Sequence, residues 1–148
     1  MIQWAFVVVY VIVMFLFASQ EASSASYTSS FLARWLPHLR AAELRQLTLI
    51  ARKAVHVTAY GVLTLITYYA SRKTKKLHRI ALPLSVVFAL LVAMLDEGYQ
   101  NRLLYRTGSA QDVLIDGLGI AVTALGLWLT SRWRKQHKEV AEDVENKR

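Results

Sequence analysis

The apolar residues of this chain are gathered into four blocks, which cover residues 2–18, 54–70, 80–95 and 113–130. Each block holds 16 to 18 residues, near the lower limit for a helix that crosses the hydrocarbon core of a bilayer. None shows the alternation of polar and apolar residues that is typical of a barrel strand. Since only helices and closed barrels satisfy their backbone hydrogen bonds in lipid, the pattern predicts an all-α integral membrane bundle of four transmembrane helices.

The connections between the blocks differ in length and character. The first connection, residues 19–45, is the longest and carries apolar residues at helical spacing: Phe31, Leu32, Trp35, Leu36 and Leu39. This spacing predicts a short interfacial helix in the first outer loop, interrupted near Pro37. We expect a transmembrane domain over residues 1–131 and a charged, partly helical cytoplasmic tail over residues 132–148.

Composition agrees with a membrane protein. The chain is 55% hydrophobic and carries a net charge of +8, with its basic residues placed between the apolar blocks. That placement favours an anionic membrane surface over nucleic acid as the partner. The absence of cysteine excludes disulfides, thiolate metal sites and a cysteine nucleophile. No Lys or Arg precedes the first block, which favours a retained span over a signal peptide.

The basic residues also predict an orientation in the cell membrane. With a cytoplasmic amino terminus, nine Lys and Arg residues near the membrane lie inside and five lie outside. Cytoplasmic loops carry the excess of Lys and Arg in multi-pass proteins. We therefore expect both termini to be cytoplasmic.

Polar residues are concentrated at the predicted outer ends of the second, third and fourth blocks. They continue into stripes of residues three and four apart, which places each stripe on one face of its helix. The predicted stripes are Lys53, His56, Tyr60, Thr64 and Thr67 on the second block, Ser85, Ala89, Val92, Asp96 and Gln100 on the third, and Asp112, Asp116, Gly119, Thr123 and Gly126 on the fourth. Four basic and four acidic residues near these ends balance one another, so that the cluster can be carried near the membrane. The basic residues are Arg52, Lys53, Arg102 and Arg106, and the acidic residues are Asp96, Glu97, Asp112 and Asp116.

In chain order, these polar residues resemble the pattern of the VanZ-like family, which is named for a teicoplanin (glycopeptide) resistance protein of Gram-positive bacteria. The matching residues are Lys53, His56, Tyr60 and Gly61, then Asp96, Glu97 and Gln100, then Arg106, Gly108, Ser109, Asp112, Asp116 and Gly119. The resemblance implies a multi-pass bacterial membrane protein linked through its namesake to glycopeptide tolerance. It does not supply a reaction.

The first functional hypothesis is a site at the extracytoplasmic membrane face that binds or acts on a cell-envelope molecule, such as a lipid-linked envelope precursor or another anionic lipid. The catalytic candidates are His56 with Asp96 or Asp112, because an imidazole and a carboxylate can act as an acid–base pair, and histidine changes charge near neutral pH. The binding candidates are Arg52, Lys53, Tyr60, Glu97, Gln100, Arg106, Ser109 and Asp116.

Three other interpretations remain open. The polar cluster can be an interhelical ion network in a structural protein, or a proton pathway in a transporter. It can also be a metal site, formed from His56, Asp96, Glu97, Asp112 and Asp116. We do not expect a metal or another cofactor, since the basic residues already supply countercharge. The sequence leaves the ligand, any reaction and the oligomeric state undetermined.

Overall fold

The computed structural model describes residues 2–20, 24–102 and 110–146, and these are almost entirely helical. The elements are α1 (Ile2–Ser19), α2 (Ala25–Trp35), α3 (Ala41–Arg72), the 3-10 turn η2 (His78–Ile80), α4 (Ala81–Gln100) and α5 (Ala110–Asn146). Four helices are long and apolar enough to cross a membrane, namely α1, α3, α4 with η2, and α5. The prediction of an all-α membrane bundle with an additional short helix is confirmed.

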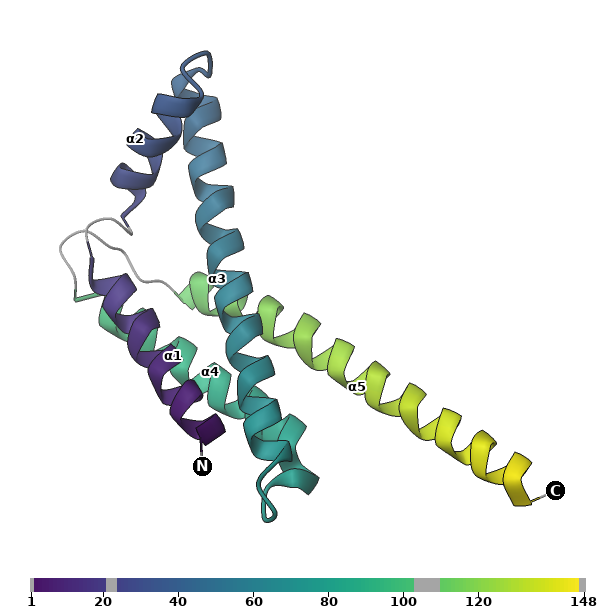
Figure 1. The fold of residues 1–148 in the computed structure, drawn as a ribbon. Helices are drawn as coiled ribbons and strands as arrows, with labels where there is room; N and C mark the ends of the chain where they lie inside the picture. The colour runs from purple at the N-terminus through teal and green to yellow at the C-terminus, as the bar shows by residue number, and fades with distance from the viewer. Residues whose placement is uncertain (1, 21–23, 103–109, 147–148) are drawn as a thin grey trace.

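Helices α1, α3 and α4 lie side by side, and α5 crosses α3 before running out of the bundle (Figure 1). The amino terminus lies at the same end as the turn between α3 and α4. At its own amino-terminal end, α3 extends beyond the other spans, and α2 packs against it there. The carboxyl-terminal end of α4 and the start of α5 lie at the end of the bundle remote from the α3–α4 turn.

Helix α3 is much longer than its apolar block, because it begins at Ala41 and not near residue 54. Residues 41–53 are rich in Ala and Leu and contain neither Gly nor Pro, so they favour a helix although charged residues interrupt the apolar ones. The backbone N–H of Arg40 donates to Glu43 Oε2 at 2.8 Å, which satisfies one donor at the helix start. The first connection is therefore shorter than the predicted 19–45.

The interior of the bundle is made of small and hydroxyl-bearing side chains as much as of large apolar ones. Within lipid there is little hydrophobic gain from pairing helices, so close approach through small residues supplies the packing. Thr64 is fully buried, and its hydroxyl donates to the carbonyl of Tyr60 at 2.8 Å within the same helix. The buried residues of α4 are Ala81, Ser85, Ala89, Val92, Ala93, Asp96, Glu97 and Gln100, which includes every member of the predicted stripe on the third block.

Helices α3 and α5 touch backbone to backbone where they cross. A Cβ atom added to Gly119 would lie 2.0 Å from the carbonyl oxygen of Val57, and one added to Gly61 would lie 2.9 Å from Thr123 Oγ1. Only glycine allows this approach. The crossing fixes which residues at the start of α5 face α3.

Helix α1 is attached to α3 and to the turn that follows α3 by two side-chain hydrogen bonds. Trp4 Nε1 donates to Thr74 Oγ1 at 3.0 Å, and the Tyr10 hydroxyl donates to the carbonyl of Ala59 at 3.1 Å. Only Val7 and Ala18 of α1 are buried. Most of this helix therefore presents apolar side chains outward, as a lipid-facing helix does.

Candidate functional site

Buried polar side chains from three helices meet near the end of the bundle remote from the α3–α4 turn. Helix α4 contributes Asp96, Glu97 and Gln100, and α5 contributes Asp116; each of these residues is at most 4% exposed. Helix α3 contributes the partly exposed His56 and the buried Tyr60. Three buried carboxyl groups in one place are costly in a membrane protein, and ionisable residues buried at such a cost usually belong to a functional site.

His56 pairs with Asp116 across the contact between α3 and α5. The distance from His56 Nδ1 to Asp116 Oδ1 is 2.9 Å, and the aspartate side chain has no exposed surface. A carboxylate on one ring nitrogen fixes the orientation of an imidazole. The pair follows from the helix crossing, since Asp116 lies one turn before Gly119 and His56 lies next to Val57.

Asp96 is held by two donors at a single carboxylate oxygen. The Tyr60 hydroxyl and Gln100 Nε2 both donate to Asp96 Oδ2 at 2.9 Å. This small network joins α3 to α4 in the same way that the histidine pair joins α3 to α5. Within the described part of the chain, Asp96 Oδ1 and Asp116 Oδ2 are buried without a hydrogen-bond partner, and such acceptors are expensive to leave unused.

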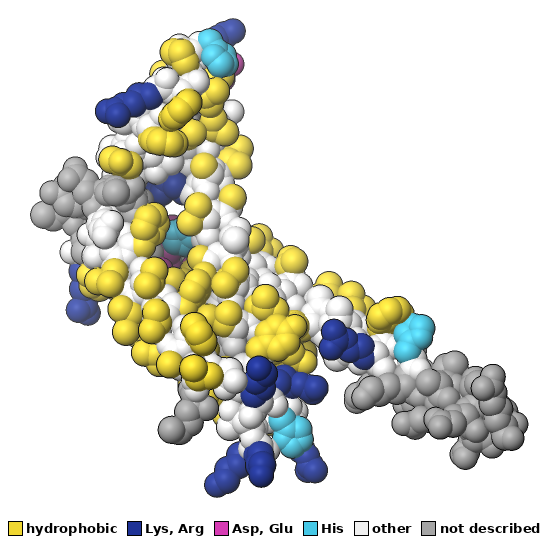
Figure 2. Space-filling view, in the orientation of Figure 1, with side chains coloured by type: hydrophobic (Ala, Val, Ile, Leu, Met, Phe, Trp, Pro, Cys, Tyr) yellow, Lys and Arg dark blue, Asp and Glu magenta, His cyan; other side chains and the backbone are white. Residues whose placement is uncertain are grey.

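A recess of about 140 Å³ opens onto this cluster. Its polar lining is Arg52, His56, Tyr60 and Asp96, and its remaining lining is Met14, Phe17 and Ala18 of α1, Thr28 of α2, and Ala51, Val55 and Ala59 of α3. Figure 2 shows a histidine and acidic side chains within a hollow bordered by hydrophobic side chains. A polar floor beside an apolar wall suits a ligand that has both a polar and an apolar part.

The predicted site residues are placed unevenly by the structure. Arg52 is half-buried at the recess, whereas Lys53 is exposed and does not line it. Asp112 is half-buried one turn before Asp116. Arg102 is exposed, whereas Arg106, Gly108 and Ser109 lie outside the described residues, as does the rest of 103–109.

A carboxylate outside the expected acid–base pair contacts His56. We expected Asp96 or Asp112 to act with His56 as an acid–base pair, and the structure brings Asp116 within hydrogen-bond distance of the imidazole. Asp96 instead accepts from Tyr60 and Gln100. The physical reason is the glycine contact at the crossing, which sets both the position and the rotation of α5 against α3.

The predicted stripe on α5 also ends earlier than its spacing suggested. Asp116 and Gly119 are buried and Thr123 is half-buried, but Gly126 is exposed. After the crossing, α5 moves away from α3 (Figure 1). The stripe on α5 therefore stops facing α3 beyond Thr123.

The wall of the recess was not found from sequence. Residues 2–18 are apolar on every side, so the contribution of Met14, Phe17 and Ala18 has no periodic signal. A signal did exist on α3, where Ala51, Val55 and Ala59 recur every four residues. They lie immediately before Arg52, His56 and Tyr60, and hence on the neighbouring face.

Three of the clustered side chains are also arranged as a metal site would be. His56, Glu97 and Asp116 each offer one donor atom, and these atoms all lie within 4.8 Å of one another. One imidazole nitrogen with two carboxylate oxygens suits divalent ions such as Mn²⁺ or Zn²⁺. The second oxygen of Asp116, buried without a described partner, offers a further donor.

The four long helices and the buried polar cluster define a multi-pass α-helical membrane protein. The family described as VanZ/LLP1 matches residues 3–132 of the 148 residues, and the chain belongs to this family. The resemblance drawn from the motifs is thereby confirmed. No curated protein and no solved structure matches the chain.

Proposed function

We propose that the recess binds the headgroup of a cell-envelope lipid at the extracytoplasmic face of the membrane. The single observation that carries this proposal is the lining of the recess, where Arg52 and His56 face the same space as Phe17 and Val55. A guanidinium group recognises phosphate or carboxylate through charge-assisted hydrogen bonds. The apolar residues are suited to the first part of a lipid chain. The ligand is therefore an anionic lipid or a lipid-linked envelope precursor.

The distribution of basic residues supports the extracytoplasmic placement. The α3–α4 turn contains Arg72, Lys73, Lys75, Lys76 and Arg79 and lies at the end of the bundle remote from the recess. Basic loops stay in the cytoplasm during insertion. This orientation places both termini in the cytoplasm and the recess in the outer leaflet.

The pair of His56 and Asp116 gives the recess a group that can take up or release a proton. An imidazole held by a carboxylate is the arrangement that general acid–base catalysis uses. Any reaction at the bound headgroup would use His56 as the proton acceptor, with Asp116 as the residue that orients it. A change in the handling of envelope lipids connects this site to glycopeptide tolerance, including tolerance of teicoplanin.

Complementation of a deletion strain tests the proposal. We expect the intact chain to restore the envelope lipid profile and teicoplanin tolerance, and His56→Ala and Arg52→Ala to fail at equal membrane abundance. Thr58→Ala is the matched control, because Thr58 is exposed on α3 and its hydroxyl bonds to Ala54 of its own helix. Full complementation by both His56→Ala and Arg52→Ala would overturn the proposal.

A second candidate function is the binding of a divalent cation by His56, Glu97 and Asp116, supported by the proximity of their donor atoms. Elemental analysis of the purified chain decides this question. About one equivalent of metal that is lost in Asp116→Asn and retained in Thr58→Ala would support it. The candidate function would be rejected if the chain complements the deletion in cells and contains no metal when it is purified from them.

A non-enzymatic role is the remaining alternative, in which the cluster is an ion network that holds helices together or a pathway for transport. The contacts of Asp96 with α3 and of Asp116 with α3 favour the structural form of this alternative. It predicts that complementation falls only in proportion to loss of folded protein. Flux measurements in liposomes separate the transport form.

A further inference from the structure

A second and larger groove lies on the other side of the helix crossing, between the carboxyl-terminal half of α3 and the middle of α5. It encloses about 720 Å³. Its lining is Leu65, Tyr68, Tyr69 and Arg72 of α3, and Thr123, Gly126, Leu127, Thr130, Ser131 and Arg134 of α5. None of these residues belongs to the recess described above.

The groove exists because α5 leaves the bundle after it crosses α3 (Figure 1). At Gly119 the two backbones are in contact, whereas a Cβ added at Gly126 would meet nothing within 4 Å. Two turns of helix are enough to open the space. Since these helices cross the membrane, the groove faces lipid along its apolar part.

The lining changes from apolar to cationic along the helices. Leu65 and Leu127 lie toward the crossing, whereas Arg72 and Arg134 lie at the far end. The hydroxyl of Thr130 donates to the carbonyl of Gly126 at 2.9 Å, and that of Ser131 donates to the carbonyl of Trp128 at 2.7 Å. Because these hydroxyl groups are used within α5, the two arginines are the groups that recognise charge.

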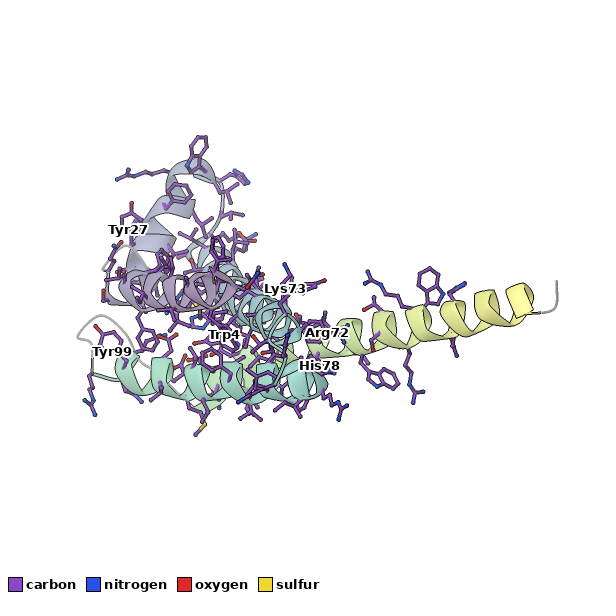
Figure 3. The ribbon with its side chains drawn as sticks, turned by 60° about the horizontal axis from the view of Figure 1, so that its bottom comes forward. Trp4, Tyr27, Arg72, Lys73, His78 and Tyr99 are labelled. Carbon is purple, nitrogen blue, oxygen red and sulfur yellow. The ribbon has the colours of Figure 1, made fainter. Side chains whose placement is uncertain are left out.

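The cationic end of the groove lies where the membrane surface is expected. Trp128 carries Arg132 over its ring at 4.6 Å, and Trp133 is 63% exposed; tryptophan concentrates at the membrane–water interface. Figure 3 shows Arg72, Lys73 and His78 together at one end of the bundle, with Tyr27 and Tyr99 at the other end. A phosphate at this level would lie among lipid headgroups.

We propose that this groove binds an anionic phospholipid, with its phosphate between Arg72 and Arg134 and an acyl chain along Leu65, Gly126 and Leu127. Among the described residues, the lining contains two arginines and no acidic residue. Arginine binds phosphate through paired hydrogen bonds, and anionic lipids attract basic segments at the membrane surface. This binding site is independent of the function proposed for the recess.

A helix from a second copy of the chain is a poorer occupant on grounds of charge. In a two-fold dimer the same patch meets itself, so Arg72 and Arg134 would face the arginines of the other copy. Like charges brought together at low dielectric repel. An anionic lipid neutralises the pair, which favours lipid over a second copy.

Native mass spectrometry of the detergent-purified full chain tests the proposal, with phosphatidylglycerol and phosphatidylcholine as probes. We expect the chain to retain phosphatidylglycerol in preference to phosphatidylcholine. In the double variant Arg72→Gln/Arg134→Gln this preference falls at least about ten-fold. The matched control is Lys75→Gln/Arg79→Gln, which removes the same charge from exposed positions outside the groove and keeps the preference.

A second variant separates the groove from a general effect of charge. Gly126→Leu fills the open space without changing charge, and we expect it to lower retention of phosphatidylglycerol while the chain stays monodisperse. Equal loss in the control double variant, or no preference in the unmodified chain, would overturn the proposal. So would a stable dimer of the unmodified chain that carries no lipid and separates in Gly126→Leu.

Discussion

At the scale of single residues, the candidate site depends on which carboxylate faces the imidazole. Asp116 uses one oxygen for His56, and its second oxygen is buried without a partner in the described part of the chain. Asp112 lies one turn away and is half-buried. Both residues are aspartates, so a difference in function between Asp112→Asn and Asp116→Asn reflects where each carboxylate lies in the structure.

We expect Asp116→Asn to remove most of the function measured in the complemented deletion strain, because an amide no longer stabilises a positive charge on His56. Loss of a residue that orients an active histidine typically costs several kcal/mol of transition-state stabilisation, on the order of 10²-fold or more in rate. Asp112→Asn should retain more function. The reverse ranking, with Asp116→Asn active and Asp112→Asn inactive, would contradict the pairing.

The network at Asp96 makes a separate prediction about stability. Tyr60→Phe removes one of the two donors to Asp96 Oδ2 and should lower the free energy of unfolding by about 1–3 kcal/mol, since a buried acceptor loses a partner. Tyr69→Phe is the matched control because Tyr69 is exposed on the same helix. Unfolding of the purified variants in detergent measures both. Equal stability of the two would show that the hydroxyl of Tyr60 contributes nothing.

At the scale of helices, the crossing of α3 and α5 determines both polar regions of the molecule. On one side of Gly119 it brings Asp116 to His56. On the other side the helices separate and leave the groove between Arg72 and Arg134. A change at the contact point should therefore disturb both ends together.

Gly119→Ala tests this element. The added Cβ would lie 2.0 Å from the carbonyl oxygen of Val57, and since a backbone atom cannot move away cheaply, the helices must shift. We expect a loss of several kcal/mol of stability, in the range of severe packing errors. Gly117→Ala is the control because nothing lies within 4 Å of its added Cβ. Thermal unfolding in detergent and the amount of monodisperse protein are the measurements, and equal behaviour of the two variants would contradict the contact.

The same helices show what sequence could and could not predict. Hydropathy located the four spans, because an apolar block of bilayer length is typical of a membrane-crossing helix and rare elsewhere. It missed the start of α3 at Ala41, because charged residues interrupt the apolar ones in the added turns of that helix. Periodicity placed His56 and Asp116 on inward faces. It could not choose Asp116 over Asp96 or Asp112, because that choice depends on how α5 crosses α3.

At the scale of the whole molecule, one strongly basic turn and the buried carboxyl groups lie toward opposite ends. The basic α3–α4 turn lies at one end, and the buried carboxyl groups lie toward the other. Because all four spans are joined by turns or loops, one measured orientation fixes all of them. The proposed orientation can therefore be tested at two positions.

Single-cysteine labelling provides that test, since the chain has no cysteine of its own. We expect Tyr27→Cys, on α2, to react with a membrane-impermeant maleimide in intact cells. Lys75→Cys, in the α3–α4 turn, should react only after the membrane is permeabilised. Both positions are exposed on the surface of the protein. Labelling of Lys75→Cys in intact cells would reverse the orientation and place the recess in the inner leaflet.

The length of α3 has a consequence for how a ligand reaches the recess. Its 32 residues extend about 48 Å at 1.5 Å per residue, well beyond a hydrocarbon core of about 30 Å. The overhang carries α2 beside the entrance, and Met14 and Phe17 of α1 form its other border. If the recess binds a lipid as proposed, the ligand reaches it by lateral diffusion within its leaflet. We then expect occupancy to depend on the number of ligand molecules per unit area of membrane, so that adding empty micelles lowers occupancy even when the total concentration of the ligand is held constant.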